Sequence, residues 1–309
     1  MSKRYLALCG GVGGAKLAYG LSRILTSSEL DIIVNTGDDF IHHGLNISPD
    51  LDTVMYTLAN INDVKKGWGI KDETWSFAKT LEKINENTWF QLGDKDLNTH
   101  IKRTFLLKQG YCLSDVTNSL CSELDIKHKI YPMSETPVST IVETSKGKMS
   151  FQEYFVKNKC KPQIKDITFK DNLHAKIPSS LEKMLKKDQF LGVIICPSNP
   201  YLSIDPLLSI NGIRDYLLNT KVPVICVSPI INNNSIKGPT VKIMKELGIK
   251  PNIESIKSHY KKIINILVVD ETDKPYFTAS TVDMKFTNIL MKTDSDKKRL
   301  AEFCIDLIS

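Results

Sequence analysis

The chain has 309 residues, of which 41% are hydrophobic and 25% are charged, and its formal net charge is +6. This composition excludes a disordered or repetitive chain, and the length suits one large or two modest domains. The apolar runs are too short to span a bilayer and no signal-peptide layout precedes the first strand, so we expect a cytoplasmic protein. Because the basic residues are spread along the chain, a small anionic substrate is favoured over nucleic acid.

The first predicted unit is a strand, a glycine-rich turn and a helix. Residues 5–9 form a short apolar run, and the helix that follows has four apolar residues on one face, Leu17, Leu21, Ile24 and Leu25. A helix start offers free N–H groups and a favourable dipole to an anion, and glycines let the backbone approach it closely. We therefore predict that three residues of the turn bind phosphate groups, Gly11, Gly13 and Gly14. The alternative is a turn that only packs the strand against the helix.

The glycine pattern does not identify the nucleotide. A dinucleotide-binding fingerprint that starts at Gly11 needs a third glycine where Lys16 stands. A P-loop that starts at Gly10 needs glycine in place of Ala15 and serine or threonine in place of Leu17. The class of nucleotide therefore stays open at this point.

Four further apolar strands are predicted, and each runs into a polar loop. Residues 32–34 lead into NTGDD, and the segments FLGVIICPSNP, VPVICVSPII and INILVVDETD repeat the pattern downstream. Open parallel α/β sheets bind ligands at the carboxyl ends of their strands, so the glycine turn and the loops NTGDD, PSNP and SPII are expected around one crevice. The predicted fold is α/β, with a Rossmann-like, mostly parallel sheet and helices on both faces.

The middle of the chain differs in character from its two ends. It is rich in tryptophan, amphipathic helices and short polar motifs, and its segment MSFQEYFVKNK fits a hairpin or a short helix equally well. We predict that residues 1–60 and 189–309 form an α/β nucleotide-binding core. Residues 61–188 are predicted to form a largely helical insertion or cap.

The segment NISPDLDTVMYTL, residues 46–58, holds the densest chemistry. Asp50 and Asp52 stand two positions apart just before a predicted helix. In a loop that leads into a helix, both carboxylates can reach one divalent cation, and Mg²⁺ sites commonly need only one or two carboxylates besides substrate phosphates. The alternative is that one of the two aspartates is the N-cap of the helix.

A second polar cluster is the segment LGDKDLNTHIKRT. If a helix begins near Leu97, then Asn98 or Thr99, Lys102 and Arg103 lie within about one turn of each other and can face a shared anion. The alternative is a solvated helix start with ordinary salt bridges. The histidine and cysteine spacings along the chain do not match those of a zinc site.

Taken together, the motifs carry a resemblance to a known family. The segments CGGVGGAKLAYGL, NTGDDF, ISPDLDTVMYTL, GWGIKDETW, LGDKDLNTHIKRT, PMSETPVSTIVET, PSNPYLSIDPLLSINGIRD and VSPIINNNSIKGPT, in this order, resemble the 2-phospho-L-lactate transferase family. The resemblance runs from about Tyr5 to the C-terminus, and the combination of PDLDT, GDKDLNTH and PSNP is far more specific than any glycine pattern. It implies an enzyme of coenzyme F-420 biosynthesis.

The reaction that this resemblance implies is a Mg²⁺-dependent transfer onto Fo, a 5-deazaflavin with a ribityl chain. The donor would be a guanosine diphosphate derivative that bears lactate or enolpyruvate on its distal phosphate. The ribityl hydroxyl would attack that phosphate, GMP would leave, and a phosphodiester would join Fo to the acid. The expected partners are therefore small molecules, with neither nucleic acid nor membrane involved, and a homodimer is expected as the commonest symmetric assembly.

The resemblance also implies roles for individual residues. Asp50 would orient the ribityl hydroxyl or accept its proton and, with Asp52, would hold the metal, for which Asp39 is a further candidate. Fo would be bound by Asp50 and three residues of the second polar cluster, Lys95, Thr99 and Arg103. The glycine turn would hold the donor phosphates.

The loop PSNP and two tryptophans complete the candidate site. Ser198 and Asn199 would face the guanosine or its ribose, and the alternative is that they only form a turn. Trp68 and Trp75 could stack on a deazaflavin, although tryptophans at such positions more often belong to a core.

Two other functions compete with the transferase. One is a regulatory protein of the same fold that binds a sugar nucleotide without transfer, which would not need the pair of motifs PDLDT and GDKDLNTH. The other is an NAD-dependent oxidoreductase, which Lys16 in the third glycine position disfavours.

Overall fold

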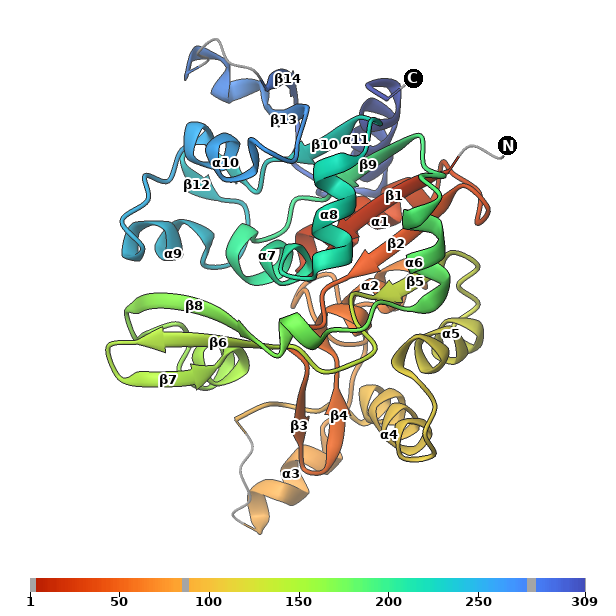
Figure 1. Ribbon diagram of the computed structural model, residues 1–309. Helices are drawn as coiled ribbons and strands as arrows, with labels where there is room; N and C mark the ends of the chain where they lie inside the picture. The colour runs from red at the N-terminus through yellow and green to blue at the C-terminus, as the bar shows by residue number, and fades with distance from the viewer. Residues whose placement is uncertain (1–3, 85–88, 277–281, 309) are drawn as a thin grey trace.

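The computed structural model describes residues 4–84, 89–276 and 282–308 (Figure 1). Its centre is a seven-stranded sheet in the order β14-β13-β10-β9-β1-β2-β5. All neighbouring strands in it run parallel, which confirms the predicted α/β sheet. The strands are β1 (Tyr5–Cys9), β2 (Leu30–Val34), β5 (Lys129–Pro132), β9 (Gly192–Ile195), β10 (Val224–Val227), β13 (Ile266–Asp270) and β14 (Asp283–Thr287).

Helices cover both faces of the sheet, as predicted. Alternate side chains of β1 enter different cores, Leu6 and Leu8 on one face and Ala7 and Cys9 on the other. The helices on the Ala7 face are α1 (Gly11–Ser22), α2 (Pro49–Leu58), α5 (Leu113–Glu123) and α11 (Asp294–Asp306). Those on the Leu6 face are α6 (Ser179–Lys186), α7 (Asp205–Leu208), α8 (Asn211–Asn219), α9 (Thr240–Glu246) and α10 (Ile253–Tyr260).

Residues 61–188 contribute to the central sheet as well as to the elements around it. Their strand β5 pairs with β2 and forms one edge of the sheet. They also form a separate antiparallel sheet in the order β7-β6-β8, which lies beside α9 in Figure 1. The other elements of this stretch are α3 (Ser76–Lys83), α4 (Asp94–Lys108), β6 (Ser139–Thr144), β7 (Gly147–Ser150), η1 (Glu153–Lys157), β8 (Ile164–Lys170) and η2 (Asn172–His174). The division into a core and an insertion stays a prediction.

The segment MSFQEYFVKNK ends β7 and then turns into the short π-helical segment η1, so it combines both predicted possibilities. The remaining elements are two hairpins and two helical turns, β3 (Phe40–His42) with β4 (Leu45–Ile47), β11 (Ile230–Ile231) with β12 (Asn234–Ser235), η3 (Pro200–Ile204) and η4 (Glu271–Tyr276). Within the described ranges, every helix is too short or too polar to cross a membrane.

Candidate active site

A cavity of about 930 Å³ lies at the carboxyl ends of the central strands. Four loops that follow separate strands contribute to its wall, with Gly11 after β1, Asp38 after β2, Ser198 after β9 and Pro229 after β10. The loops that the sequence pattern placed around one crevice therefore meet, as expected for an open parallel sheet.

The glycine turn forms one end of this wall. α1 begins at Gly11, whose φ of +61° is a conformation that favours glycine. A side chain at Gly13 would collide with the main-chain carbonyl of Pro197, and one at Gly14 would come within 2.5 Å of Ser198 Oγ. Gly11 and Gly13 line the cavity, whereas Gly14 packs α1 against the loop after β9. The turn thus presents backbone to the cavity and also needs glycine for packing.

Asp50 is a buried carboxylate in the cavity wall. It lies with Asp52 in the first turn of α2, whose N-cap is Ser48, so the interpretation of either aspartate as the N-cap is wrong. Asn35 Nδ2 donates to Asp50 Oδ2 at 2.9 Å. Burial raises the pKa of Asp50 to about 6, and hydrogen bonds from Asn35 and the Gly11 N–H limit the rise. A carboxylate with such a pKa can accept a proton near neutral pH.

Asp38 is a second buried carboxylate in the wall, and sequence reasoning did not single it out. Its Oδ1 accepts a hydrogen bond from Asn35 Nδ2 at 3.1 Å, so one amide bridges Asp38 and Asp50. Its Oδ2 accepts a hydrogen bond from Gln152 Nε2 at 3.2 Å. Burial and the charge of Asp50 raise the pKa of Asp38 well above its usual range. The signal was present in NTGDD, where Asp38 stands beside Asp39.

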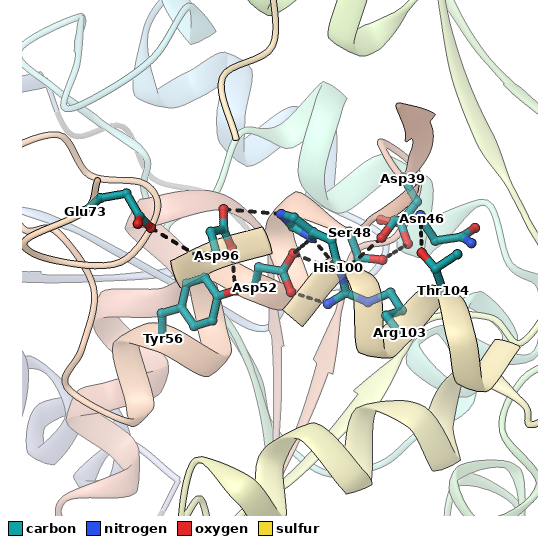
Figure 2. Close-up of polar contacts among 10 residues, drawn as sticks. All are labelled: Asp39, Asn46, Ser48, Asp52, Tyr56, Glu73, Asp96, His100, Arg103 and Thr104. Atoms are coloured by element: carbon teal, nitrogen blue, oxygen red, sulfur yellow. Dashed lines mark hydrogen bonds and ion pairs between the residues drawn. The ribbon is translucent and has the colours of Figure 1, made fainter. Parts of the chain in front are cut away.

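Asp52 belongs to a different buried network, shown in Figure 2. Both of its carboxylate oxygens accept hydrogen bonds from the Arg103 guanidinium, with Oδ2 3.1 Å from Nη1. Arg103 is only 1% exposed, so the two side chains form a bidentate ion pair inside the protein. The pair joins α2 to α4 and explains why an arginine occurs on the buried face of α4.

His100 connects this ion pair to a second carboxylate of the network, that of Asp96. Its Nδ1 lies 3.3 Å from Arg103 Nη1, and because a guanidinium only donates, Nδ1 is the acceptor. Its Nε2 lies 3.3 Å from Asp96 Oδ2, and Tyr56 donates to Asp96 Oδ1 at 2.5 Å. Burial raises the pKa of Asp96, but the contacts with His100 and Tyr56 outweigh it and lower the pKa below its usual value.

The network contains a group that can hold a metal ion. Asp52, Asp96 and His100 each bring one ligand atom to within 4.8 Å of the others. Two carboxylates and an imidazole suit a transition metal better than Mg²⁺, which prefers oxygen ligands. Of the three predicted ligands, Asp52 alone belongs to this group. Asp39 Oδ2 accepts a hydrogen bond from Ser48 Oγ at 2.6 Å.

The start of α4 lies at Asp94, so the predicted start near Leu97 is wrong. Glu73 explains the difference, because its carboxylate accepts the N–H groups of Lys95 at 2.7 Å and of Asp96 at 3.1 Å. A side chain from outside the helix thus caps its first turn. Such a cap is absent from the local sequence pattern.

The other residues predicted on α4 lie outside the cavity wall. Lys95 is exposed and donates from Nζ to the carbonyl of Lys71, at 3.1 Å. Thr99 is buried against α2. Lys102 pairs with Glu123 and Arg103 with Asp52, so the idea that these cations face a shared anion is wrong. The roles of Lys95, Thr99 and Arg103 in substrate binding stay predictions.

Ser198 and Asn199 line the cavity after β9. Ser198 Oγ accepts a hydrogen bond from the Gly10 N–H at 3.2 Å and so fixes the start of the glycine turn. Asn199 Oδ1 accepts the N–H groups of Tyr201 and Leu202 and is the N-cap of η3. Both side chains therefore have structural contacts in addition to their place in the wall.

None of the six lysines that line the cavity was assigned from the sequence, and two of them, Lys16 and Lys237, have lowered pKa values. Lys16 Nζ donates to the carbonyl of Met291 at 2.9 Å. Burial lowers the pKa of Lys16, and the charges of Lys237 and Lys297 lower it further. Lys237 also lines the cavity, and burial lowers its pKa as well. Because the fold holds Lys16 and Lys237 close together, an anion is favoured near them. The sequence signal for this anion site was the lysine at position 16, where a dinucleotide-binding fingerprint has its third glycine.

Aromatic side chains line a further part of the cavity. They come from three segments and comprise Trp68, Trp89, Phe90, Phe151 and Phe155. The rings of Phe151 and Phe155 stack with centroids 5.2 Å apart. Trp68 is 44% exposed and contacts Trp75 edge-on, so it is not a core residue. Flat aromatic ligands bind to walls of this kind.

The chain resembles proteins of one described family along almost its whole length. The family model of the 2-phospho-L-lactate transferase CofD matches residues 6–307. Proteins named 2-phospho-L-lactate transferase are similar to it, one from Methanocaldococcus jannaschii at 38% identity over 96% of this chain and 97% of that protein. Another, from Methanosarcina mazei, is 34% identical over 96% of this chain and 97% of that protein.

The fold is also found in a solved structure. A crystal structure of a protein of the UPF0052 family from Bacillus halodurans superposes with a TM-score of 0.64, at 12% identity, over 99% of both chains. At that identity the likeness concerns the fold alone. The family model and the relatives above one third identity, by contrast, cover the glycine turn, PDLDT, GDKDLNTH and PSNP together. The chain therefore belongs to the 2-phospho-L-lactate transferase family CofD.

Proposed function

We propose that the protein transfers a phospholactate or phosphoenolpyruvate group from a guanosine-diphosphate-linked donor to the ribityl hydroxyl of Fo and releases GMP. The observation that carries the proposal is the position of two buried carboxylates, Asp38 and Asp50, in the same cavity wall as the glycine turn. A reaction that breaks a diphosphate needs phosphate binding and charge neutralisation at one place. Family membership supports this choice among reactions of that type.

The donor would bind with its phosphates at the glycine turn. Gly11 and Gly13 bring backbone to the cavity at the start of α1, where the helix dipole favours an anion. The ammonium groups of Lys16 and Lys237 add positive charge nearby. With the phosphates in this position, Ser198 and Asn199 would lie toward the guanosine of the donor and contact it.

The acceptor would bind between the carboxylates and the aromatic wall. Fo has a flat ring that can stack on aromatic side chains, and its ribityl hydroxyl must reach the distal phosphate of the donor. Asp50 would bind this hydroxyl and accept its proton as oxygen forms the new bond to phosphorus. The bond between phosphorus and the bridging oxygen breaks, and GMP leaves with the electron pair.

Mg²⁺ would be held by Asp38 and Asp50. Asn35 Nδ2 lies within 3.1 Å of one oxygen of each carboxylate, so two acidic groups of raised pKa share one region of the wall. A cation there would relieve their repulsion, and the oxygen ligands suit Mg²⁺. The group of Asp52, Asp96 and His100 fits less well, because Arg103 already neutralises Asp52. When bound, Mg²⁺ neutralises charge on the transferred phosphate.

Mass spectrometry of the products tests the proposed function. Purified protein is mixed with Fo, Mg²⁺ and either the lactyl or the enolpyruvyl diphosphoguanosine donor, and a parallel sample contains EDTA. We expect a phosphodiester of Fo together with GMP from one or both donors, and no product with EDTA. Protein that binds GDP but forms no product with either donor would contradict the proposal and favour a nucleotide-binding regulator.

A further inference from the structure

Gln152 connects two parts of the cavity that are far apart in the sequence. Its side chain is 4% exposed and forms part of the wall. Nε2 donates to Asp38 Oδ2 at 3.2 Å and lies 3.4 Å from the main-chain oxygen of the same residue. Asp38 follows β2 of the central sheet, whereas Gln152 follows β7 of the small antiparallel sheet. The contact is therefore a bridge between the two sheets.

The carboxylate that Gln152 contacts is fixed from both sides. Asn35 Nδ2 donates to Asp38 Oδ1 at 3.1 Å, and Gln152 Nε2 donates to Oδ2. Both donors are neutral amides, so Asp38 keeps its negative charge when it is ionised. Asp52 differs in this respect, because the Arg103 guanidinium cancels its charge. The environment of Asp38 is that of a carboxylate kept in place and left free to attract a cation.

The segment around Gln152 contributes two side chains to the aromatic part of the wall. Phe151 and Phe155 flank it in sequence, stack on each other and line the cavity. Glu153 Oε2 accepts the N–H and the hydroxyl of Ser150, at 3.0 and 3.1 Å, which fixes this segment to the end of β7. The turn that follows, η1, is π-helical, a conformation that is rare and frequent at functional sites.

We propose that Gln152 is a positioning residue that sets the Asp38 carboxylate beside Asp50 and couples it to the aromatic wall. A ligand that stacks on Phe151 and Phe155 fixes the backbone on either side of Gln152. The hydrogen bond from the Gln152 amide then restricts the position of the Asp38 carboxylate. Mg²⁺ at Asp38 and Asp50 would in turn favour the ordered wall, because the coupling of two binding sites is reciprocal. The inference rests on the proposed function for the identities of the cation and the acceptor.

The test combines Gln152→Met with Asp38→Asn in a double-mutant cycle. Methionine keeps the length and approximate volume of glutamine but has no donor. Calorimetry of Mg²⁺ binding to the substrate-free protein is expected to give a Kd about tenfold higher for Gln152→Met than for the unsubstituted protein. In the Asp38→Asn background, the same substitution should change the Kd by less than twofold, because the partner of the amide has already changed.

Fo fluorescence and steady-state kinetics supply the second readout. In the unsubstituted protein Mg²⁺ should tighten Fo binding, and Gln152→Met should reduce that effect at least threefold. The variant should also have a kcat at least tenfold lower, with the KM for the donor unchanged within twofold.

Gln109→Met, at the exposed end of α4, is the matched control and should leave all these quantities unchanged. Melting temperatures within 3 °C of the unsubstituted protein would show that the variants fold.

Two outcomes of the Gln152→Met measurements overturn the inference. One is a Gln152→Met variant with unchanged Mg²⁺ affinity and kcat, and the other is equal weakening of Mg²⁺ binding in both backgrounds. Failure of the proposed function would look different, because the unsubstituted protein would then form no phosphodiester from either donor. An unsubstituted protein that transfers the group but binds no Mg²⁺ would overturn the coupling alone.

Discussion

Two aspartates separated by one residue differ in what surrounds them. Asp50 has only neutral donors, Asn35 and the Gly11 N–H, while Asp52 faces a guanidinium. Side chains at i and i+2 point to different sides of a helix, so this divergence follows from helix geometry once α2 begins at Pro49. The expectation that the Asp50 and Asp52 carboxylates both reach one divalent cation assumed that the two residues lie in a loop before the helix.

Asp50→Asn is expected to reduce turnover at saturating substrates at least 100-fold, because the proposed proton acceptor is lost. The same variant should melt a few degrees higher at pH 7 in EDTA, since asparagine removes a buried charge that shares an amide with Asp38. Unchanged turnover would remove Asp50 from the mechanism.

The pH dependence of stability is a separate consequence of the raised pKa of Asp50. The folded chain holds a proton on Asp50 up to about pH 6, whereas the unfolded chain releases it near pH 4. Between these values the folded state binds more protons, so the contribution of Asp50 to the free energy of unfolding falls as pH rises. Metal-free melting curves at several pH values should show this decline, and it should be smaller in Asp50→Asn. An identical pH dependence in both proteins would contradict the assignment.

The buried pair of Arg103 and Asp52 provides a prediction about stability. Arg103→Met leaves Asp52 unpaired inside the protein and is expected to lower the free energy of unfolding by about 3–5 kcal/mol. Adding Asp52→Asn should restore part of the loss. Lys102→Met, which removes the neighbouring exposed pair with Glu123, is the control and should cost less than about 1 kcal/mol. Urea titrations measure all three, and equal losses for Arg103→Met and Lys102→Met would contradict the account.

At the scale of elements, the sequence pattern was reliable where local residues decide the structure. The apolar runs of β1, β2, β9, β10 and β13 are buried on both faces, which is why they read as continuous rather than alternating. The start of α4 was misplaced because its cap, Glu73, comes from another segment. The small sheet was not predicted, since its strands β6, β7 and β8 are partly exposed and so lack the continuous apolar runs of the central strands.

The packing of α1 against the loop after β9 makes the glycine turn testable. Gly13→Ala is expected to weaken GDP binding at least tenfold, because its Cβ would collide with the backbone carbonyl of Pro197 and displace the turn. Gly212→Ala is the matched control, since it lies in α8 and its Cβ would meet only the flexible end of Ile177. That control should bind GDP normally and be as stable or up to about 1 kcal/mol more stable. Calorimetry with GDP would contradict this account if Gly13→Ala bound as tightly as the control.

For the whole molecule, ligand binding should be visible as stabilisation. A ligand that binds only the folded state at 100 times its Kd adds about 2.7 kcal/mol to the free energy of unfolding. In a protein of 309 residues this corresponds to a rise of several degrees in melting temperature. We expect such a rise with GDP and none with NADH. A rise with NADH alone would favour an oxidoreductase.

The expected homodimer stays a prediction at this scale. If the protein is a homodimer, light scattering coupled to size-exclusion chromatography would give twice the chain mass of 34.8 kDa. A mass of one chain at micromolar concentration would contradict it. Ile101 and Phe105, exposed four residues apart on α4, are suitable positions at which to probe an interface with lysine substitutions.

The sequence by itself determined the parallel α/β sheet, the helices on its two faces and the crevice at the strand ends, because burial and glycine-marked turns leave local periodic patterns. The motif order also carried the family. Only the tertiary structure decided which carboxylates meet. Asp38 and Asp50 share Asn35, Asp52 joins Arg103, and Gln152 reaches Asp38 from 114 residues away. Such contacts join segments that no local pattern relates, and burial in the folded chain is what raises the pKa values of Asp38 and Asp50.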